Sequence, residues 1–475
     1  MSDVQQTHDH LSTVSDASET PSFVDRMDLT SIASLATAIR NRTSSTSVAC
    51  TVNPVPKSGS YNVVWFVDFE DNVHWVFRTP QTEWSPWLER RMRSDIVTMK
   101  LIQSRTTIPI PVIHDFSLDT NNVIGRPYIF FDRVEGTQIC KLWFDPMWFT
   151  EERRKNVFRS LVSCMSQLRE LKFSSIGCLE YDPKTDAHIV GPLLPTYAGI
   201  SQGITFLEGP YYTSHDYLLS RISREFSEAD SDLEKQCLAL LRLFAGGLPD
   251  QSLDGPPFVL SMPDFNYQNI FVDNEGHVTG LIDWDNTRTF ARQGGYARYP
   301  SWITRDWDPL WYAYHAQDEV PDGEDNEERH LQEDSDYLSD HVASGRSKDD
   351  HLDSSMEEDA SLSKDVNGIA AQSDHLPRRE QIHEDSPEVL QKFRDEYLCI
   401  FGEVDPDSAN FTRDSHIYEA IDIGVPSQIG RDQILYRLAE YVFGRDPNYA
   451  DLSAWSLLEG ISVGQWLKPQ VTKLT

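Results

Sequence analysis

Positive charge is scarce in this chain of 475 residues, which has 42 lysines and arginines against 75 aspartates and glutamates, for a formal net charge of −33. Binding to the phosphate backbone of a nucleic acid or to anionic lipid depends on a basic face of the protein. The composition therefore argues against nucleic acid and against a membrane surface as partners.

Long hydrophobic runs are missing as well. No stretch of about 18 apolar residues is present to span a bilayer, and the polar, acidic residues 1–20 lack the apolar segment of a secretory signal. The six cysteines include no CxxC pair, which favours reduced thiols over a disulfide framework or a zinc site. Together these absences predict a cytoplasmic protein.

About half of the acidity lies in one segment. Residues 318–385 contain 22 acidic and 6 basic residues, a net charge of −16, and show no hydrophobic periodicity. Segments of this composition cannot bury enough apolar surface to offset the entropy cost of folding. We therefore expect a disordered acidic insertion at 318–385 and a disordered N-terminus at 1–20.

Residues 21–135 have the pattern of a small α+β lobe. Two runs rich in β-branched and aromatic residues, 61–69 and 74–79, flank a short polar turn, which predicts a hairpin. In residues 87–104, apolar side chains recur every three or four positions, which predicts a helix. Two further strands are predicted at 110–116 and 127–134.

The rest of the chain, residues 136–317 and 386–475, is mainly helical in pattern, and a β-rich segment at 258–283 interrupts the helices. A small β-rich part followed by a larger helical part predicts an α+β fold with two lobes. The predicted helices are 152–171, 233–248, 387–401, 415–424, 432–444 and 452–461.

The β-rich segment carries the residues with the strongest chemical signal. Asp264 falls in a loop between two predicted strands, Asn269 begins the second strand, and Asp283 ends the third. A hairpin would bring Asn269 and Asp283 together at one end of the sheet. Phosphoryl transfer needs a carboxylate that orients the attacking hydroxyl, and an amide and a second carboxylate that hold Mg²⁺ against the phosphates.

With these residues the chain resembles the aminoglycoside phosphotransferase/choline kinase-like family, and most of all its fungal branch. The Asp-x4-Asn loop and the strand–turn–strand that leads to Ile-Asp-Trp carry the resemblance, which covers roughly residues 55–315. The resemblance implies a two-lobed protein-kinase-like fold and an enzyme that moves the γ-phosphate of ATP to a hydroxyl of a small molecule. It also implies that Asp264 is the catalytic base and that Asn269 and Asp283 bind Mg²⁺.

The same resemblance implies a set of nucleotide-binding residues in the first lobe. Gly59 and Ser60 fall in the loop that covers the phosphates. Arg78 stands where the family has a lysine that pairs with the α- and β-phosphates, and an arginine keeps that charge and can bind phosphate with two N–H groups. Asp95 stands where a helix glutamate pairs with this cation, and its side chain is one methylene shorter.

Asp132 and Val134 align with the hinge between the lobes, whose backbone would hydrogen-bond the adenine of ATP. The identity of the acceptor is not encoded in any motif, because acceptors of the family range over aminoglycosides, choline-like alcohols and other metabolites. The acidity of the chain favours a cationic acceptor, such as an amine-bearing alcohol.

Met262 is a departure from the family, many of whose members have a histidine two residues before the catalytic aspartate. A methionine can pack there but cannot donate the supporting hydrogen bond, a loss on the order of 1 kcal/mol. With Asp95 and the single glycine of the phosphate loop, this departure leaves an alternative open. The chain would then be a catalytically degenerate nucleotide-binding pseudokinase, or a scaffold protein with an acidic interaction segment.

Overall fold

The computed structural model describes residues 23–42, 47–308, 312, 314 and 383–443. Both segments expected to be disordered fall outside these ranges, apart from the last three residues of the acidic insertion. The helix predicted at 452–461 also lies outside the described residues.

The chain divides into one unit made of Met1–Ala313 with Asp385–Thr475 and a second unit, Tyr314–Glu384. Every helix and strand described below belongs to the first unit. The helix α7 (Pro387–Val404), which follows the second unit in sequence, packs against α3 (Glu151–Met165), which precedes it. The parts of the chain on either side of the acidic segment therefore share one core.

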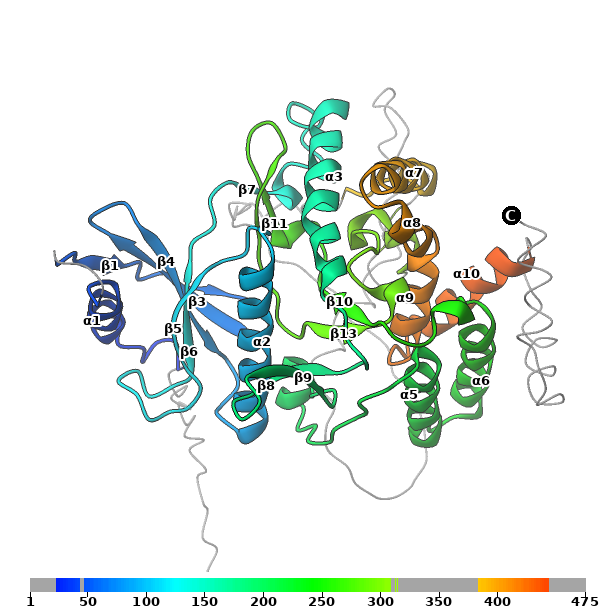
Figure 1. Ribbon diagram of the computed structural model, residues 1–475, viewed down its shortest axis with the longest axis horizontal. Helices are drawn as coiled ribbons and strands as arrows, with labels where there is room; N and C mark the ends of the chain where they lie inside the picture. The colour runs from blue at the N-terminus through cyan, green and yellow to red at the C-terminus, as the bar shows by residue number, and fades with distance from the viewer. Residues whose placement is uncertain (1–22, 43–46, 309–311, 313, 315–382, 444–475) are drawn as a thin grey trace, which may run out of the picture. The chain divides into compact units, whose positions relative to one another are not determined.

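The N-terminal lobe is built on a six-stranded antiparallel sheet of order β1-β3-β4-β6-β5, with β2 also paired to β3 (Figure 1). The predicted hairpin is confirmed, since β3 and β4 pair in register from Asn62 opposite Pro80 to Asp68 opposite His74. The strands are β1 (Cys50–Val52), β2 (Lys57–Ser58), β3 (Asn62–Phe69), β4 (His74–Pro80), β5 (Ile113–Ser117) and β6 (Tyr128–Asp132).

The two faces of this sheet pack against different helices (Figure 1). Successive side chains of a strand point to opposite faces, and on β6 Phe130 packs in a cluster with α1 (Leu29–Arg40). Its neighbours Ile129 and Phe131 instead join the core around α2 (Pro86–Arg105). The sequence patterns predicted α2 but not α1.

The helix α2 begins at a strong N-terminal signal. The Ser85 side chain accepts a hydrogen bond from the backbone N–H of Leu88 at 3.1 Å, and Pro86 occupies the first turn, where its missing N–H costs nothing. The apolar face of α2 is buried as predicted, but Arg91 and Asp95 are also buried, each 1% exposed. Buried charges need partners. The partners of Arg91 and Asp95 lie in the site described below.

The C-terminal lobe is mainly helical, which confirms the α+β class with a β-rich first lobe and a larger helical second lobe. A second core joins α5, α6, α9 and α10, which Figure 1 shows grouped on the side away from the N-terminal sheet. The remaining helices are α4 (Tyr197–Ser201), α5 (Ser214–Glu228), α6 (Asp232–Gly247), α8 (Pro406–Arg413), α9 (Ser415–Gly424) and α10 (Arg431–Phe443).

Within the described residues, the C-terminal lobe has three small antiparallel sheets: β8 with β9, β10 with β13, and β12-β11-β7. The hairpin predicted around the chemical signal is confirmed, because β11 and β12 pair from Ile270 opposite Leu281. The strands are β7 (Thr137–Gln138), β8 (Cys178–Asp182), β9 (Ala187–Gly191), β10 (Val259–Ser261), β11 (Ile270–Val272), β12 (Val278–Leu281) and β13 (Arg288–Phe290). Short 3-10 helices include Tyr267–Asn269, Arg292–Gly294, Ser301–Ile303 and Arg305–Trp307.

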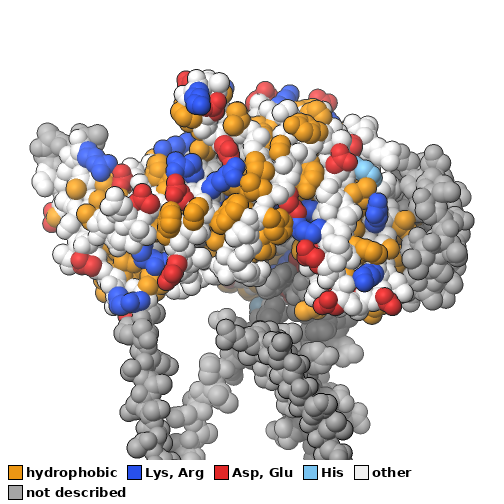
Figure 2. Space-filling view, turned by 90° about the horizontal axis from the view of Figure 1, so that it is seen from below, with side chains coloured by type: hydrophobic (Ala, Val, Ile, Leu, Met, Phe, Trp, Pro, Cys, Tyr) orange, Lys and Arg blue, Asp and Glu red, His pale blue; other side chains and the backbone are white. Residues whose placement is uncertain are grey.

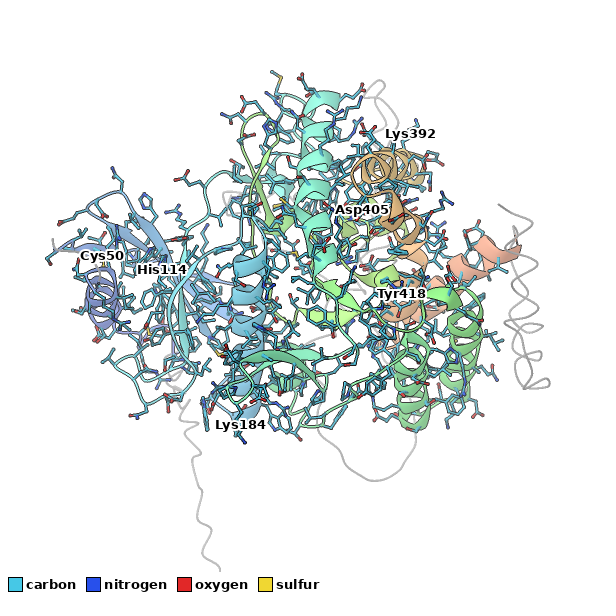
Figure 3. The ribbon with its side chains drawn as sticks, in the orientation of Figure 1. Cys50, His114, Lys184, Lys392, Asp405 and Tyr418 are labelled. Atoms are coloured by element: carbon cyan, nitrogen blue, oxygen red, sulfur yellow. The ribbon has the colours of Figure 1, made fainter. Side chains whose placement is uncertain are left out.

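The surface has mixed character. Figure 2 shows hydrophobic side chains running across the middle of one face, with lysine, arginine and acidic side chains interspersed. All six cysteines are free, and Figure 3 labels Cys50 in the N-terminal lobe. Within the described part of the chain, no helix is both long and apolar enough to cross a membrane.

Candidate active site

The loop after β10 holds Asp264. Its side-chain oxygen Oδ2 accepts hydrogen bonds from Asn269 Nδ2 at 2.8 Å and from Gln268 Nε2 at 3.1 Å. Asn269 Nδ2 also donates to the backbone carbonyl of Asp264 at 3.0 Å. These bonds fix the Asp264 carboxylate against the start of β11, and its half-buried side chain lines a cavity.

Asp283 follows β12 and lies beside Asn269, as the hairpin predicted. The backbone N–H of Ile282 donates to the carbonyl of Asn269 at 2.9 Å, which brings the next residue to the same end of the hairpin. Asp283 has a φ of 60°, in the left-handed region that costs a residue with a side chain roughly 1 kcal/mol. The strained turn directs the chain from β12 towards the N-terminal lobe.

The pKa of Asp283 is raised well above its usual value. Burial is the largest cause, and the nearby carboxylates of Asp285 and Asp264 raise the pKa further, whereas Arg78 and a backbone hydrogen bond lower it. Crowded, desolvated carboxylates resist ionisation unless a cation offsets their charge. This end of the hairpin is therefore short of positive charge.

A divalent cation fits this shortage. Within the described residues no cluster of three or more histidine, cysteine or acidic side chains is arranged to hold a metal by protein ligands alone. Mg²⁺ does not need such a cage in phosphotransferases, since one or two carboxylates and the phosphates of the substrate usually suffice. The Asp283 carboxylate and the side-chain oxygen of Asn269 are suitable oxygen ligands of this kind.

Arg78, on β4, reaches the same segment from the N-terminal lobe. Its Nη2 lies 2.9 Å from Oδ1 of Asp285, and both side chains are largely buried, 13% and 7% exposed. Asn62, at the start of β3, donates to Oδ2 of Asp285 at 3.2 Å. The prediction that Arg78 pairs with Asp95 is therefore wrong, because the Arg78 guanidinium pairs with Asp285 instead.

Asp95, on α2, has other partners. Arg91, one turn earlier, binds it through Nη2 at 2.5 Å and Nε at 3.3 Å, and the Tyr197 hydroxyl donates at 3.0 Å. The backbone N–H of Asn286 donates to Oδ1 of Asp95 at 3.1 Å. Burial raises the pKa of Asp95 to about 6, the Arg91 charge opposes that rise, and Asp285 adds to it.

These contacts form one network from the first lobe to the turn after Asp283. Asp95 holds the backbone of Asn286, while Arg78 and Asn62 hold the side chain of the preceding Asp285. Arg78 and Asp95 are thus connected through the turn after Asp283 and not to each other. The short side chain of Asp95 can join this network because the backbone N–H of Asn286 lies within hydrogen-bonding distance of its carboxylate.

The segment expected to cover the phosphates forms the turn between β2 and β3. The backbone N–H of Gly59 donates to the carbonyl of Asn62 at 2.9 Å, and Gln81 Nε2 donates to the carbonyl of Gly59 at 2.5 Å. Ser60 is exposed at the tip of the turn. Because Asn62 also contacts Asp285, this turn lies next to the turn after Asp283.

The expected hinge residues lie at the end of β6 and just after it. Asp132 ends the strand, and its Oδ1 lies 2.6 Å from Nε2 of His114 on β5, which Figure 3 labels in the sheet. The side chain of Val134 packs closely over Gly280 of β12, where an added Cβ would lie 2.2 Å from Val134 Cγ1. Glycine is thus required at position 280 for the hinge to approach the hairpin.

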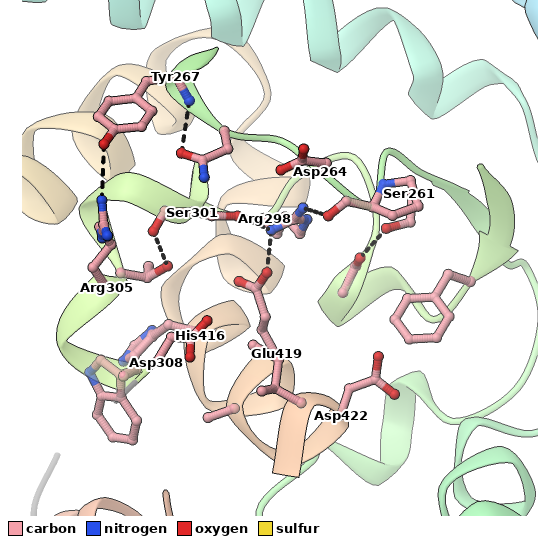
Figure 4. Close-up of a pocket in the computed structure, with 18 of the residues that line it drawn as sticks. Ser261, Asp264, Tyr267, Arg298, Ser301, Arg305, Asp308, His416, Glu419 and Asp422 are labelled. Carbon is pink, nitrogen blue, oxygen red and sulfur yellow. Dashed lines mark hydrogen bonds and ion pairs between the residues drawn. The ribbon is translucent and has the colours of Figure 1, made fainter. Parts of the chain in front are cut away.

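A cavity of about 640 Å³ opens beside Asp264, within the C-terminal lobe (Figure 4). Small-molecule sites commonly have volumes of about 300–1,000 Å³. Its charged residues include the ion pairs Arg298 with Glu419 and Arg288 with Asp422, the second at 3.0 Å. Other lining side chains are aromatic, among them Tyr267, Phe290, Trp307 and His416.

The structure thus brings together Asp264, Asn269 and Asp283, with Arg78 and Asp95 held to the adjoining turn. The sequence patterns did not reveal the parts that Arg91, Tyr197 and Asp285 play in this network. An arginine four residues before an aspartate on a helix signals an i, i+4 pair, but its burial was not visible in the sequence. No sequence signal distinguished Tyr197.

A β-rich lobe and a helical lobe, with an aspartate, an asparagine and a second aspartate close to their junction, have the arrangement expected of a two-lobed protein-kinase-like phosphotransferase. The chain belongs to the phosphotransferase enzyme family (APH), whose sequence model matches residues 52–322, more than half of the chain. The family resemblance read from the sequence is thereby confirmed.

Curated relatives are distant. The chain is 23% identical over 125 residues to "Altered inheritance of mitochondria protein 9, mitochondrial" of Meyerozyma guilliermondii, a match that covers 26% of this chain and 20% of the relative. It is 21% identical over 128 residues to a "Subtelomeric hrmA-associated cluster protein" of Aspergillus fumigatus, covering 27% of this chain and 24% of the relative. The matched part thus spans only about a fifth to a quarter of these relatives.

Two solved structures illustrate the structural likeness. A thermostable mutant of aminoglycoside phosphotransferase APH(4)-Ia in its apo form is 14% identical, with a TM-score of 0.40, covering 92% of this chain and 99% of that chain. Macrolide 2'-phosphotransferase type I is 14% identical with a TM-score of 0.34, covering 57% of this chain and 77% of that chain. At such distances the substrates of these enzymes do not transfer to this chain.

Proposed function

We propose that the protein is an ATP-dependent phosphotransferase that moves the γ-phosphate to a hydroxyl group of a small molecule. The observation that carries the proposal is the convergence of Asp264, Asn269 and Asp283 on one hairpin beside a cavity of small-molecule size. Membership of the phosphotransferase family supports the same reaction class.

Asp264 is the proposed catalytic base. Both side-chain N–H donors that fix it bind Oδ2, so the proton of an acceptor hydroxyl would go to Oδ1. The cavity that Asp264 lines is the proposed acceptor site. A hydroxyl held there would be oriented for attack on the γ-phosphate, which is the principal task of the base in phosphoryl transfer.

Asn269 and Asp283 are the proposed ligands of Mg²⁺, and Arg78 the proposed partner of the nucleotide phosphates. Bound Mg²⁺ would supply positive charge that offsets the charge of the phosphates. Asp283 would lose its proton as the cation binds, because its pKa is raised in the absence of one. Arg78 would exchange part of its contact with Asp285 for phosphate oxygens. Gly59 and Ser60 would cover the phosphates, and the backbone of Asp132 and Val134 would bind adenine.

The proposed acceptor is a small hydroxylated molecule and the proposed compartment is the cytoplasm. The acidic side chains Asp264, Asp308, Glu419 and Asp422 line the cavity, as do three arginines, Arg288, Arg298 and Arg305. Charges of both signs suit an acceptor with several polar groups better than a purely apolar one. A protonated amine on the acceptor would add to the attraction of the net negative chain.

An ATP-consumption screen over a library of hydroxylated metabolites, with Mg²⁺ present, tests the proposal. We expect turnover with at least one class of acceptor, and a loss of about a thousandfold or more in Asp264→Asn. The matched control is Asp273→Asn on the same hairpin, where the carboxylate accepts backbone hydrogen bonds from Glu275 and His277 in the turn. This control should retain the activity of the natural chain.

The pseudokinase alternative predicts a different result. Calorimetry would then show Mg·ATP binding that Asp283→Asn weakens, while no acceptor in the library would be phosphorylated. Equal turnover by the natural chain and by Asp264→Asn would contradict the role of Asp264 directly.

A further inference from the structure

The two residues before Asp264 are held by their backbone carbonyls. Met262 is buried, 1% exposed, and its thioether cannot donate a hydrogen bond. Its carbonyl oxygen accepts from Arg298 Nη2 at 2.9 Å, and the carbonyl of Pro263 accepts from the same nitrogen at 2.8 Å. One guanidinium thus fixes two consecutive peptide units immediately before the proposed base.

The position of Arg298 is itself fixed by several contacts. Only 4% of its side chain is exposed, and its second terminal nitrogen, Nη1, donates to Ser301 Oγ at 3.1 Å and to the carboxylate of Glu419. The guanidinium also lies 5.8 Å from the centre of the Phe265 ring. A buried arginine with a carboxylate partner and four hydrogen bonds has little freedom to move.

Neighbouring residues hold the loop from the same side. Ser261 Oγ donates to the carbonyl of Gly294 at 2.8 Å, and the backbone N–H of Ser301 donates to the carbonyl of Phe265 at 2.8 Å. The loop around Asp264 is therefore bonded along its length to the segment 294–301, in which Arg298 makes the contacts nearest to Asp264.

Glu419 connects this support to the cavity. It lies on α9, where His416, Glu419, Ala420 and Ile423 share the helix face that lines the cavity. Figure 4 shows the Glu419 side chain pointing from α9 towards Arg298, and the guanidinium of Arg298 between Glu419 and the loop that carries Asp264. A chain of contacts thus runs from the wall of the cavity to the backbone beside the base.

We propose that Arg298 is the positioning residue of the Asp264 loop and that it couples this loop, through Glu419, to the α9 wall of the acceptor cavity. The inference rests on the proposed role of Asp264. Arg298 supplies the hydrogen-bond donors that Met262 lacks, so the departure at position 262 is compensated by a residue distant in sequence. Arg298 itself transfers no proton and contacts no phosphate.

The test compares Arg298→Lys with Arg394→Lys. Arg394 is also buried, and its guanidinium binds Asp306 at 2.6 and 3.0 Å and the carbonyl of Ile303 at 2.8 Å. Lysine keeps the charge in both variants but cannot donate along the fork of a guanidinium. The control therefore loses a comparable buried guanidinium group, whose hydrogen bonds and ion pair lie outside the Asp264 loop.

Amide hydrogen exchange of the peptide that contains residues 258–269 is measured on the full chain without nucleotide. We expect exchange of this peptide to accelerate about tenfold or more in Arg298→Lys and to be unchanged in Arg394→Lys. Equal protection of the peptide in both variants would overturn the positioning role. This readout needs no turnover, so it decides the inference even if the phosphotransfer proposal fails.

Kinetics with an acceptor found in the screen provide the second readout. We expect kcat to fall roughly tenfold to a hundredfold in Arg298→Lys, with the Kd of Mg·ATP unchanged, because Arg298 lies in the acceptor half of the site. Adding guanidinium chloride at low concentration to Arg298→Ala should restore part of kcat, since the vacated space opens on the cavity. A loss of kcat that matches the loss of folded protein, with no rescue, would indicate a purely structural role.

The coupling through α9 is tested by Glu419→Gln, which keeps the side-chain shape and removes the charge. We expect a smaller acceleration of exchange in the same peptide than in Arg298→Lys, together with a raised KM for the acceptor. Unchanged exchange in Glu419→Gln would overturn the coupling to the cavity wall and leave Arg298 acting alone.

Discussion

The two sides of the proposed site are held in different ways. On the side of the first lobe, two buried ion pairs hold the site in place: Arg78 with Asp285, and Arg91 with Asp95. On the acceptor side, Arg298 holds the Asp264 loop mainly through backbone carbonyls. The first arrangement depends on the protonation and the charge of its partners, whereas peptide carbonyls do not titrate.

This difference shows how departures from a family pattern are absorbed. On the proposed nucleotide side, Arg78 and Asp95 stand where the resemblance implies a lysine and a glutamate, and each has a partner of opposite charge. At Met262 no side-chain substitute is available within the loop, so the support comes from a residue in another segment. In both cases the partner lies in another segment of the chain: Asp285 for Arg78, and Arg298 for the backbone of Met262.

The largest expected effect follows from removing Asp95. In Asp95→Ala the buried Arg91 charge, the Tyr197 hydroxyl and the Asn286 N–H all lose their partner. Leaving a buried charge unpaired typically costs about 3–5 kcal/mol, and we expect the free energy of unfolding in urea to fall by that amount. Within the same helix, Glu89→Ala removes an exposed i, i+4 pair with Arg93 and should cost less than about 0.5 kcal/mol. Equal losses would mean that the buried network contributes no more than a surface pair.

The partner of Arg78 can be identified with a double-mutant cycle. Alanine substitutions at Arg78 and Asp285, singly and together, should show a coupling free energy of about 1–3 kcal/mol in thermal or urea unfolding. A second cycle with Arg78 and Asp95 is the matched comparison and should give a smaller value, because these side chains are linked only through the turn. A larger coupling to Asp95 would restore the pairing expected from the family.

The charge-dependent side should also respond to pH. Because the folded-state pKa of Asp283 is raised, the folded chain binds the proton more tightly than the unfolded chain does. Stability from this group is present below the ordinary carboxyl pKa, near 4, and is lost as pH rises through the raised pKa, an effect on the order of 1 kcal/mol. We therefore expect the Tm of Asp283→Asn to rise relative to that of the natural chain as pH increases from about 4 to 8. Mg·ATP should reverse that preference, since the cation favours the ionised carboxylate. A difference that does not vary with pH would contradict the raised pKa.

The smallest effect is expected at the hinge. Asp132 pairs with His114 at 2.6 Å, but its side chain is 43% exposed, and exposed pairs contribute about 0–1 kcal/mol. Asp132→Ala should lower the free energy of unfolding by less than about 1 kcal/mol and leave the Kd of Mg·ATP nearly unchanged, because the proposed contact with adenine is made by the backbone. A large loss of nucleotide affinity would show that the carboxylate itself takes part. His114→Ala, which removes the other partner, is the control.

Much of the site could be predicted from the sequence because its central part is local. Asp264, Asn269 and Asp283 lie on neighbouring turns of one small β-structure, and strand alternation together with the turn between β11 and β12 sets their proximity. The helix α2 and the strands β3 and β4 could likewise be predicted from the sequence, because apolar spacing decides which residues face a core. These predictions depend on contacts between residues close in the chain.

The partners of the charged residues were not predictable in this way. Asn62 and Asp285 are 223 positions apart, and Arg298 and Glu419 are 121 positions apart. The chain has 75 acidic residues, so the sequence offers many partners for every arginine. Asp306 shows the difficulty, because its carboxylate binds the buried Arg394, which lies 88 positions away in the sequence.

The sequence by itself determined the phosphotransferase family, the hairpin next to Asp264, Asn269 and Asp283, and the order of a β-rich and a helical lobe. Only the tertiary structure decided that Arg78 binds Asp285, that Asp95 binds Arg91 and Tyr197, and that Arg298 supports the loop at Met262. The physical reason is that periodicity and turns act over a few residues. The strength of an ion pair or hydrogen bond instead depends on which groups share the same buried space, and folding alone sets that.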